Sequence, residues 1–296
     1  MFRRLQDNRE VPHRLCDHFL FGFGGKRGMR MNTQIETIHT DGFTMDYFRF
    51  GHGKKTLVIL PGLSVDSVMK YADSVAEAYN LLADDFTVCV FDRRKELPAV
   101  YSVYEMAEDT AAAMRALGLD HVCLFGASQG GMIAMLIAAG YPELVGRLVL
   151  GSTAARLETG KSEIIENWIH LAKAGDAKGL YLAFGEAIYP PAVFEQSRDL
   201  LTAAAESVTD TDLRRFVILA EGIRGFDARD QLREISCPVL VIGSSDDRVL
   251  GAEAPEQIAE YLKGHTACEL YMYNGYGHAA YDLAPDYKER LFHFLT

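Results

Sequence analysis

A serine between two glycines stands where a short apolar run meets a long uncharged segment. Residues 126–130 spell Gly-Ala-Ser-Gln-Gly, the pattern G-x-S-x-G, with Ser128 at its centre. The apolar run 122–125 predicts a buried strand, and residues 131–141, which carry no charged side chain, predict a helix buried on all sides. The sharp turn between such a strand and helix lifts a serine hydroxyl clear of the sheet. The pattern therefore predicts that Ser128 is a nucleophile.

A serine hydroxyl needs a neighbouring base to become reactive at neutral pH. Of the nine histidines, His278 follows the last predicted strand, within the glycine-rich stretch 274–280. Catalytic groups of a parallel sheet gather in the loops at the carboxyl ends of its strands. The other histidines lie at the opposite ends of strands, on helices, in the first hairpin or near the N-terminus. We therefore expect His278 to be the base.

The base needs an acid that holds its tautomer and orientation. Two adjacent carboxylates, Asp246 and Asp247, follow the predicted strand 239–242. We select Asp246, because Asp247 stands beside Arg248 and is more typical of an exposed charge or a loop cap. The order along the chain is then Ser128, Asp246, His278.

Acyl transfer also needs hydrogen-bond donors for the oxyanion of the tetrahedral intermediate. One predicted donor is the backbone N–H of Gln129, at the start of the helix after the serine. The other is the backbone N–H of Leu63, because Gly62 lets the loop after strand 57–60 turn inward. An ordinary Pro-Gly turn at residues 61–62 is the alternative.

Strands and helices alternate along most of the chain. Apolar or alternating runs predict strands at residues 35–38, 45–48, 57–60, 87–91, 122–125, 148–150, 239–242 and 270–273. Helical spacing predicts helices at residues 68–82, 104–117, 131–141, 254–262 and 286–295. The first two strands form a hairpin around Asp41-Gly42. This alternation predicts an α/β fold, with a mostly parallel central sheet covered by helices on both faces.

No strand is predicted between residues 152 and 236, where only helical stripes occur. We interpret this segment as a helical cap, or lid, inserted after the sixth strand of a core domain made of residues 31–151 and 237–296. Its stripes supply four candidate substrate-binding residues, Trp168, Phe184, Ile188 and Tyr189. The alternative is that these side chains only form the interior of the cap. A pocket built from them favours uncharged, apolar groups.

Composition limits the classes of partner. The chain has 296 residues, 49% of them hydrophobic, and a formal net charge of -11, which disfavours nucleic-acid binding. The five cysteines are odd in number and lack C-x-x-C spacing, so we expect a reducing, cytoplasmic setting and no metal site or cofactor. No apolar run is long enough to span a membrane. Residues 1–30 are rich in arginine, and we interpret them as an appended N-terminal arm.

From about residue 32 to its end, the chain resembles the α/β-hydrolase family, in its members with a helical cap. Four segments carry the resemblance: residues 60–63 (Leu-Pro-Gly-Leu), 126–130, 243–246 (Gly-Ser-Ser-Asp) and 277–278 (Gly-His). Residues 91–94 (Phe-Asp-Arg-Arg) also resemble the family's segment after the fourth strand. The chain departs from many members at Pro61, where they have histidine, and at residues 95–98. Residues 151–156 are similar to the enol-lactonase and small-ester branch.

The residues and the resemblance together predict a serine hydrolase of small carboxylic esters, with lactones and thioesters as related substrates. Ser128 attacks, His278 carries the proton and Asp246 orients His278. An acyltransferase or a peptidase with the same three residues is an alternative, as is a non-catalytic binding protein of the same fold. The sequence leaves open whether the protein is a monomer or a homodimer.

Overall fold

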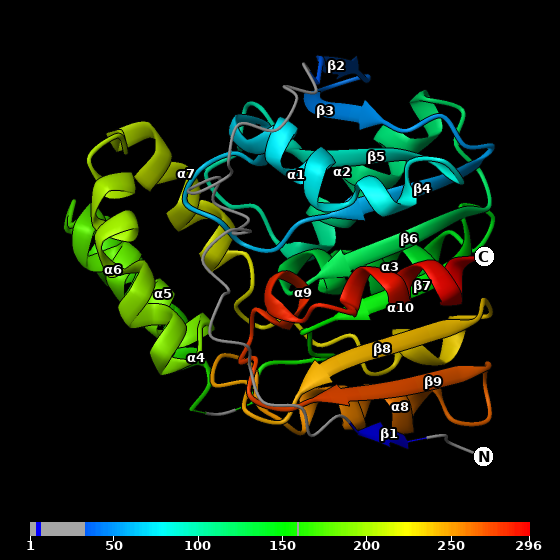
Figure 1. Cartoon of the computed structure of the whole chain (residues 1–296). Helices are drawn as coiled ribbons and strands as arrows, with labels where there is room; N and C mark the ends of the chain where they lie inside the picture. Colours follow the sequence, from blue (N-terminus) through cyan, green and yellow to red (C-terminus); the bar gives the residue numbers. More distant parts are fainter. Residues whose placement is uncertain (1–3, 7–32, 159) are drawn as a thin grey trace.

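The computed structural model describes residues 4–6, 33–158 and 160–296, and its core is a nine-stranded sheet (Figure 1). The strands lie in the order β1-β9-β8-β7-β6-β4-β5-β3-β2. Their bounds are β1 Arg4–Gln6, β2 Ile35–His39, β3 Thr44–Phe50, β4 Lys55–Leu60, β5 Phe86–Arg94, β6 Val122–Ala127, β7 Val145–Gly151, β8 Val239–Ser244 and β9 Cys268–Tyr273. All pairings from β5 to β1 are parallel, whereas β2 and β3 form the predicted antiparallel hairpin and β3 joins β5 antiparallel.

Helices cover both faces of this sheet, as predicted (Figure 1). Helices α1 (Ala72–Ala78) and α10 (Tyr287–Leu295) lie on one face. Helices α2 (Val103–Ala116), α3 (Gln129–Gly140) and α8 (Ala254–Leu262) lie on the other. The single helix predicted for residues 68–82 is instead α1 between two 3₁₀ turns, Val68–Tyr71 and Asn80–Leu82. The chain therefore has the predicted α/β class, with both faces of its sheet buried.

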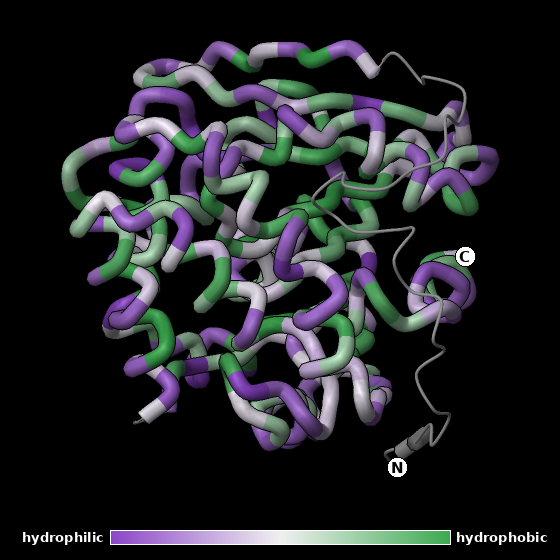
Figure 2. Tube along the Cα trace, turned by 60° about the vertical axis from the view of Figure 1, so that its left-hand side comes forward, coloured by the Kyte–Doolittle hydropathy of each residue, from purple (hydrophilic) through white to green (hydrophobic). Residues whose placement is uncertain are grey.

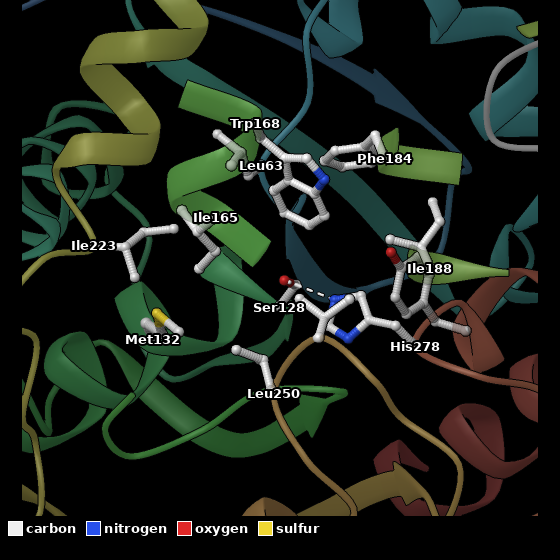
Figure 3. A pocket seen from close by; sticks show the side chains of 12 residues that line it. Leu63, Ser128, Met132, Ile165, Trp168, Phe184, Ile188, Ile223, Leu250 and His278 are labelled. Atoms are coloured by element: carbon white, nitrogen blue, oxygen red, sulfur yellow. Dashed lines mark hydrogen bonds between the residues drawn. The ribbon is translucent and has the colours of Figure 1, made fainter. Parts of the chain in front are cut away.

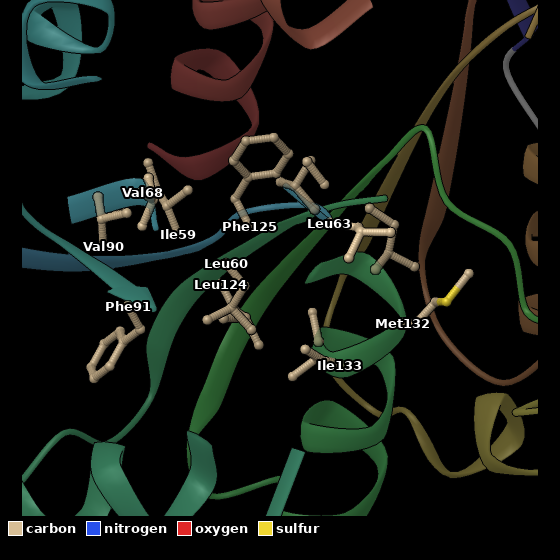
Figure 4. Close-up of a cluster of buried hydrophobic side chains, with 14 of the residues drawn as sticks. Ile59, Leu60, Leu63, Val68, Val90, Phe91, Leu124, Phe125, Met132 and Ile133 are labelled. Atoms are coloured by element: carbon tan, nitrogen blue, oxygen red, sulfur yellow. The ribbon is translucent and has the colours of Figure 1, made fainter. Parts of the chain in front are cut away.

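The central strands are apolar along their whole length because helices cover both of their faces. Every residue of β6 and of β8 is buried, and the last four residues of β4 are as well. Figure 4 shows how Leu60 of β4, Leu124 of β6 and Ile133 of α3 gather between the sheet and this helix. Hydrophobic stretches, green in Figure 2, accordingly recur through the interior of the fold. This packing fixes β4, β6 and the start of α3, which carry the candidate site.

Four helices connect β7 to β8: α4 (Ser162–Lys173), α5 (Ala177–Ile188), α6 (Pro191–Ala205) and α7 (Asp210–Glu221). They gather at one end of the sheet, to the left in Figure 1. Each is amphipathic, with an apolar face that is buried and a charged face that is exposed. Since β7 and β8 are neighbours in the sheet, this helical segment enters and leaves the core at adjacent points. The domain boundaries themselves, at residues 152 and 236, stay a prediction.

The N-terminal segment contributes a strand that the sequence did not predict. Residues Arg4–Gln6 form β1, which pairs in parallel with Leu270–Met272 at the edge of the sheet. The rest of the predicted arm, residues 1–3 and 7–30, lies outside the described residues. Among the residues that are described, no helix combines the length and the apolar character needed to cross a membrane.

Candidate active site

Ser128 occupies a strained turn between β6 and α3, as the sequence predicts. Its φ of 53° lies in the left-handed region, which side chains other than glycine rarely adopt. The turn is so tight that a Cβ added at Gly126 would lie 2.3 Å from the carbonyl oxygen of Gly130. A Cβ added at Gly130 would lie 2.0 Å from the oxygen of Leu60 on β4. The two glycines of the motif are therefore required for close approach of helix, turn and strand.

His278 meets Ser128 from the loop that follows β9. Its Nε2 lies 3.0 Å from Ser128 Oγ, and its side chain is almost fully buried (Figure 3). Gly277, with a φ of +61°, turns the loop, and Ala279 donates its N–H to the carbonyl of Ile188 at 3.1 Å. The loop is thus anchored to the end of α5, and the sequence prediction that His278 reaches Ser128 is confirmed.

Asp247, and not Asp246, contacts the histidine. Asp247 Oδ2 lies 2.8 Å from His278 Nδ1, and both side chains are less than 5% exposed. The other carboxylate oxygen of Asp247 accepts the backbone N–H groups of Val249 and Leu250, at 2.8 and 3.0 Å. The prediction that Asp246 orients His278 is therefore wrong by one residue.

The neighbour of Asp247 explains the error. Arg248 does not hold this carboxylate at the surface, because its guanidinium donates to the backbone carbonyls of Glu186 and Tyr189 at the end of α5. Asp246 faces the other way and accepts the N–H groups of Gly275 and Gly277, at 3.0 and 3.1 Å. Asp246 thus shapes the loop that carries His278 without contacting the imidazole.

Asp247 is charged despite its burial. Burial alone raises the pKa of its carboxyl, but the charge and hydrogen bond of His278, with the N–H groups of Leu250 and Val249, bring the pKa below its ordinary value of 3.8. An ionised carboxylate holds the Nδ1 proton of the imidazole, which leaves Nε2 free to accept a proton from Ser128.

The two predicted oxyanion donors lie on either side of Ser128. Gln129 follows it in the chain, and a Cβ added at Gly62 would lie 3.1 Å from the Cβ of Ser128, so the turn before Leu63 also reaches the serine. Within the described part of the chain, neither the Leu63 nor the Gln129 backbone N–H donates a hydrogen bond. Their role toward an oxyanion stays a prediction.

Comparison with known proteins agrees with the fold. Residues 55–174 match the family model described as "alpha/beta hydrolase fold". The solved structure of MGS-M2, an alpha/beta hydrolase enzyme from a Medee basin deep-sea metagenome library, superposes with a TM-score of 0.78 at 22% identity, covering 88% of this chain and 96% of that one. The enol-lactonase of Burkholderia xenovorans gives a TM-score of 0.75 at 20% identity, covering 88% and 99%.

The chain has the α/β-hydrolase fold.

Curated relatives are similar over most of this fold. The protein named "Putative carbamate hydrolase RutD" of Rhizobium rhizogenes is 25% identical over 81% of this chain and 92% of its own length. "3-oxoadipate enol-lactonase 2" of Acinetobacter baylyi is 20% identical over 79% and 87%. The names of both relatives describe hydrolases.

A buried arginine of this α/β-hydrolase fold connects the turn before Leu63 with the side chain of Gln129. Arg93, at the end of β5, donates to the carbonyl of Pro61 at 2.8 Å and to the side-chain oxygen of Gln129 at 3.2 Å. The Gln129 amide in turn donates to the carbonyl of Leu219 in α7, at 2.7 Å. Burial lowers the pKa of Arg93 to about 10. Arg93 lies in the segment 91–94 that resembles the α/β-hydrolase family. Its contact with Gln129 depends on the order of the strands in the sheet, so no local sequence pattern predicts it.

An apolar hollow opens above Ser128 and His278 (Figure 3). Three of the four predicted substrate-binding residues line it: Trp168 from α4, and Phe184 and Ile188 from α5. Tyr189 lines neither this hollow nor a second cavity beside it, and it is buried at the end of α5 with only 1% of its surface exposed. Leu63, Met132, Ile165, Ile223, Val249, Leu250 and Tyr281 complete the walls of the hollow.

Among the described residues, no three side chains of His, Cys, Asp or Glu are placed to share a metal ion. Cys89, Cys123 and Cys237 are buried as free thiols, and Cys268 is half-buried. Cys16 lies outside the described residues.

Proposed function

We propose that this protein is a serine hydrolase that cleaves carboxylic esters of small, mainly apolar substrates, with lactones and thioesters as related targets. One observation carries the proposal: an unbroken path of contacts from Ser128 Oγ to His278 Nε2 at 3.0 Å, and from His278 Nδ1 to Asp247 at 2.8 Å. This geometry suits proton transfer from the serine to the imidazole as the hydroxyl attacks.

The reaction proceeds in two halves. Ser128 Oγ bonds to the ester carbonyl carbon while its proton passes to His278 Nε2, and the backbone N–H groups of Leu63 and Gln129 hold the oxyanion. Collapse expels the alcohol, which takes the proton from Nε2 and leaves an acyl group on Ser128. A water molecule then gives a proton to His278 and attacks the acyl carbon. When the bond between this carbon and Ser128 Oγ breaks, His278 returns the proton to Oγ, which releases the acid and restores the serine.

The character of the hollow supports small, apolar substrates. Apart from Ser128 and His278, its walls come from aliphatic, thioether and aromatic side chains. An ionised group in the hollow would lose its hydration without gaining a charged partner there. The helices between β7 and β8 supply Ile165, Trp168, Phe184 and Ile188, so we assign this segment the role of a lid that selects the substrate.

Hydrolysis of p-nitrophenyl acetate, butyrate, hexanoate and octanoate tests the proposal. We expect Ser128→Ala to lower kcat by about 10⁴- to 10⁶-fold, as removal of a nucleophile does in comparable sites. Ser207→Ala is the matched control, because Ser207 is exposed at the end of α6 and only donates to the carbonyl of Ala204. Unchanged hydrolysis by Ser128→Ala would reject the proposal, because the nucleophile would then be another residue. No hydrolysis of any of these esters by the wild type would favour a non-catalytic binding protein.

A further inference from the structure

A second cavity adjoins the hollow above Ser128. It shares four wall residues with that hollow, Leu63, Phe184, Ile188 and Tyr281. Pro61 and Gly62 also line it, so the predicted oxyanion loop lies between the two spaces. An ester whose carbonyl sits at this loop can therefore direct one of its two arms into each space.

The second cavity differs from the first because two carboxylates line its otherwise mainly apolar walls. Asp66 is one of them, and its own protein contacts already satisfy it. The hydroxyls of Tyr71 and Tyr181 each donate to it at 2.8 Å, and Lys70 forms an ion pair with it. Asp66 therefore contributes negative charge to the cavity but has little capacity left for a ligand.

Asp282 is the other carboxylate, and unlike Asp66 it can still accept a hydrogen bond from a ligand. It lies in α9 (Ala280–Leu283), four residues after His278, and it is half-buried on the cavity wall. Among the described residues its carboxylate neither accepts a hydrogen bond nor forms an ion pair. Lys288, the neighbouring cation, donates instead to the carbonyl oxygens of Tyr281 and Asp282, at 2.7 and 3.5 Å. Burial raises the pKa of the Asp282 carboxyl to about 7, as expected for an enclosed acid with incomplete compensation.

We propose that the second cavity binds one arm of the substrate, and that this arm carries an uncharged hydrogen-bond donor, a hydroxyl or an amide N–H, which donates to Asp282. This inference rests on the proposed ester hydrolysis and adds a polar requirement to it. The catalytic hollow takes the apolar arm, and the second cavity takes the arm with the donor.

The charges around the cavity favour an uncharged donor over an ion. A carboxylate arm would meet the carboxyl groups of Asp66 and Asp282, and no cation is among the described wall residues, so the arm would lose its hydration without compensation. An ammonium arm would have to compete with Lys288, a half-buried cation whose charge already acts on Asp282. A hydroxyl or an amide N–H forms the hydrogen bond without either cost, and an enclosed acceptor is stabilised by gaining such a partner.

Two matched ester series test the inference. In the acyl series, p-nitrophenyl heptanoate, ω-hydroxyhexanoate and ω-aminohexanoate have arms of equal length. In the alcohol series, heptyl, ω-hydroxyhexyl and ω-aminohexyl acetates have alcohol arms of equal length. The readout is the hydroxy-to-alkyl ratio of kcat/KM. In at least one series we expect Asp282→Leu to lower this ratio by about three- to tenfold, the usual effect of one lost hydrogen bond.

Further variants distinguish the loss of the hydrogen bond from the loss of a negative charge and from the loss of folding. Asp282→Asn keeps an acceptor oxygen and should keep most of the wild-type ratio. Glu289→Gln removes one carboxylate from an exposed position of α10 and should leave the ratio within about twofold. If Asp282→Leu does not fold, Asp282→Ala makes the same comparison.

Two results would overturn the inference: equal ratios for wild type and Asp282→Leu in both series, or a wild-type preference for the ammonium esters. Hydrolysis of plain p-nitrophenyl heptanoate tests the proposed function separately. Whether this hydrolysis depends on Ser128 is decided independently of the hydroxy-to-alkyl ratios.

Discussion

His278 and Asp247 form a 2.8 Å contact between two side chains that are each less than 5% exposed. The chain holds this pair from both sides. Backbone N–H groups of Val249 and Leu250 fix the Asp247 carboxylate, while Asp246 fixes Gly275 and Gly277 in the loop of His278. The two adjacent aspartates thus have separate tasks, one toward the imidazole and one toward its loop.

These tasks predict different outcomes for the two asparagine variants. Asp247→Asn leaves the shape of the side chain intact but favours the wrong imidazole tautomer, so we expect kcat to fall by about 10⁴-fold. Asp246→Asn weakens the hydrogen bonds to the loop, so we expect a loss of about 1–3 kcal/mol in unfolding free energy and less than about a tenfold loss of kcat. Ester hydrolysis and urea unfolding of both proteins measure these effects. The opposite ranking in kcat would return the orienting role to Asp246.

The lowered pKa of Asp247 predicts how stability depends on pH. The folded protein holds this carboxyl ionised below its ordinary pKa of 3.8, so the unfolded chain binds more protons in that range. The contribution of Asp247 to stability is therefore complete above about pH 4 and is lost as the pH falls through the folded-state pKa.

Urea unfolding of wild type and Asp247→Asn measures this dependence. The difference in unfolding free energy between the two proteins should be larger at about pH 6 than at about pH 3. A difference that is constant, or that grows toward acid, would show that Asp247 is not a stabilised carboxylate.

Arg93 is a positioning residue in this account, because it contacts Pro61 and Gln129 and not the reacting atoms. Arg93→Met should loosen both oxyanion donors, lowering kcat by about 10- to 100-fold with little change in KM, since the donors act mainly in the transition state. Arg94→Met is the matched control, because Arg94 contacts Glu96, Asp109 and Gly42 away from the site. A rise in KM alone, or an equal loss in both variants, would assign Arg93 a purely structural role.

Trp168 limits the length of the apolar arm in this account. Its indole packs against Phe184 in a tilted arrangement with ring centroids 4.5 Å apart, and both rings line the hollow above Ser128. Trp168→Ala should enlarge the hollow and move the preferred chain length in the p-nitrophenyl ester series upward. Each additional buried methylene should raise kcat/KM by up to about fourfold, from ~0.8 kcal/mol per CH₂. A variant that is less stable but keeps the wild-type chain-length profile would make Trp168 part of the lid interior only.

Local pattern was sufficient for most of the fold and for two of the three proposed catalytic residues. The apolar runs at 57–60 and 122–125 and the glycines around Ser128 predicted strands, turn and helix, because burial and close approach depend on neighbours in the chain. His278 could be predicted because parallel strands end at a common edge of the sheet.

What the sequence could not supply was the direction of a side chain. Positions 246 and 247 both hold aspartate, so the sequence does not distinguish them. Their roles depend on the conformation of the loop, in which Arg248 contacts the end of α5. The strand Arg4–Gln6 pairs with residues of β9 that lie more than 260 positions away in the chain. The composition of residues 1–30 therefore did not predict it. The proposed binding role of Asp282 could not be predicted either, because it depends on the cavity that this residue lines.

Covalent labelling of Ser128 tests the central claim most directly. The wild-type protein is treated with a fluorophosphonate, which forms a stable bond with an activated serine, and the adduct is located by mass spectrometry of peptides. We predict one adduct, on the peptide that contains Ser128, and loss of both the adduct and ester hydrolysis in Ser128→Ala, with Ser207→Ala labelled as the wild type is. Unchanged labelling and hydrolysis in Ser128→Ala would contradict the account.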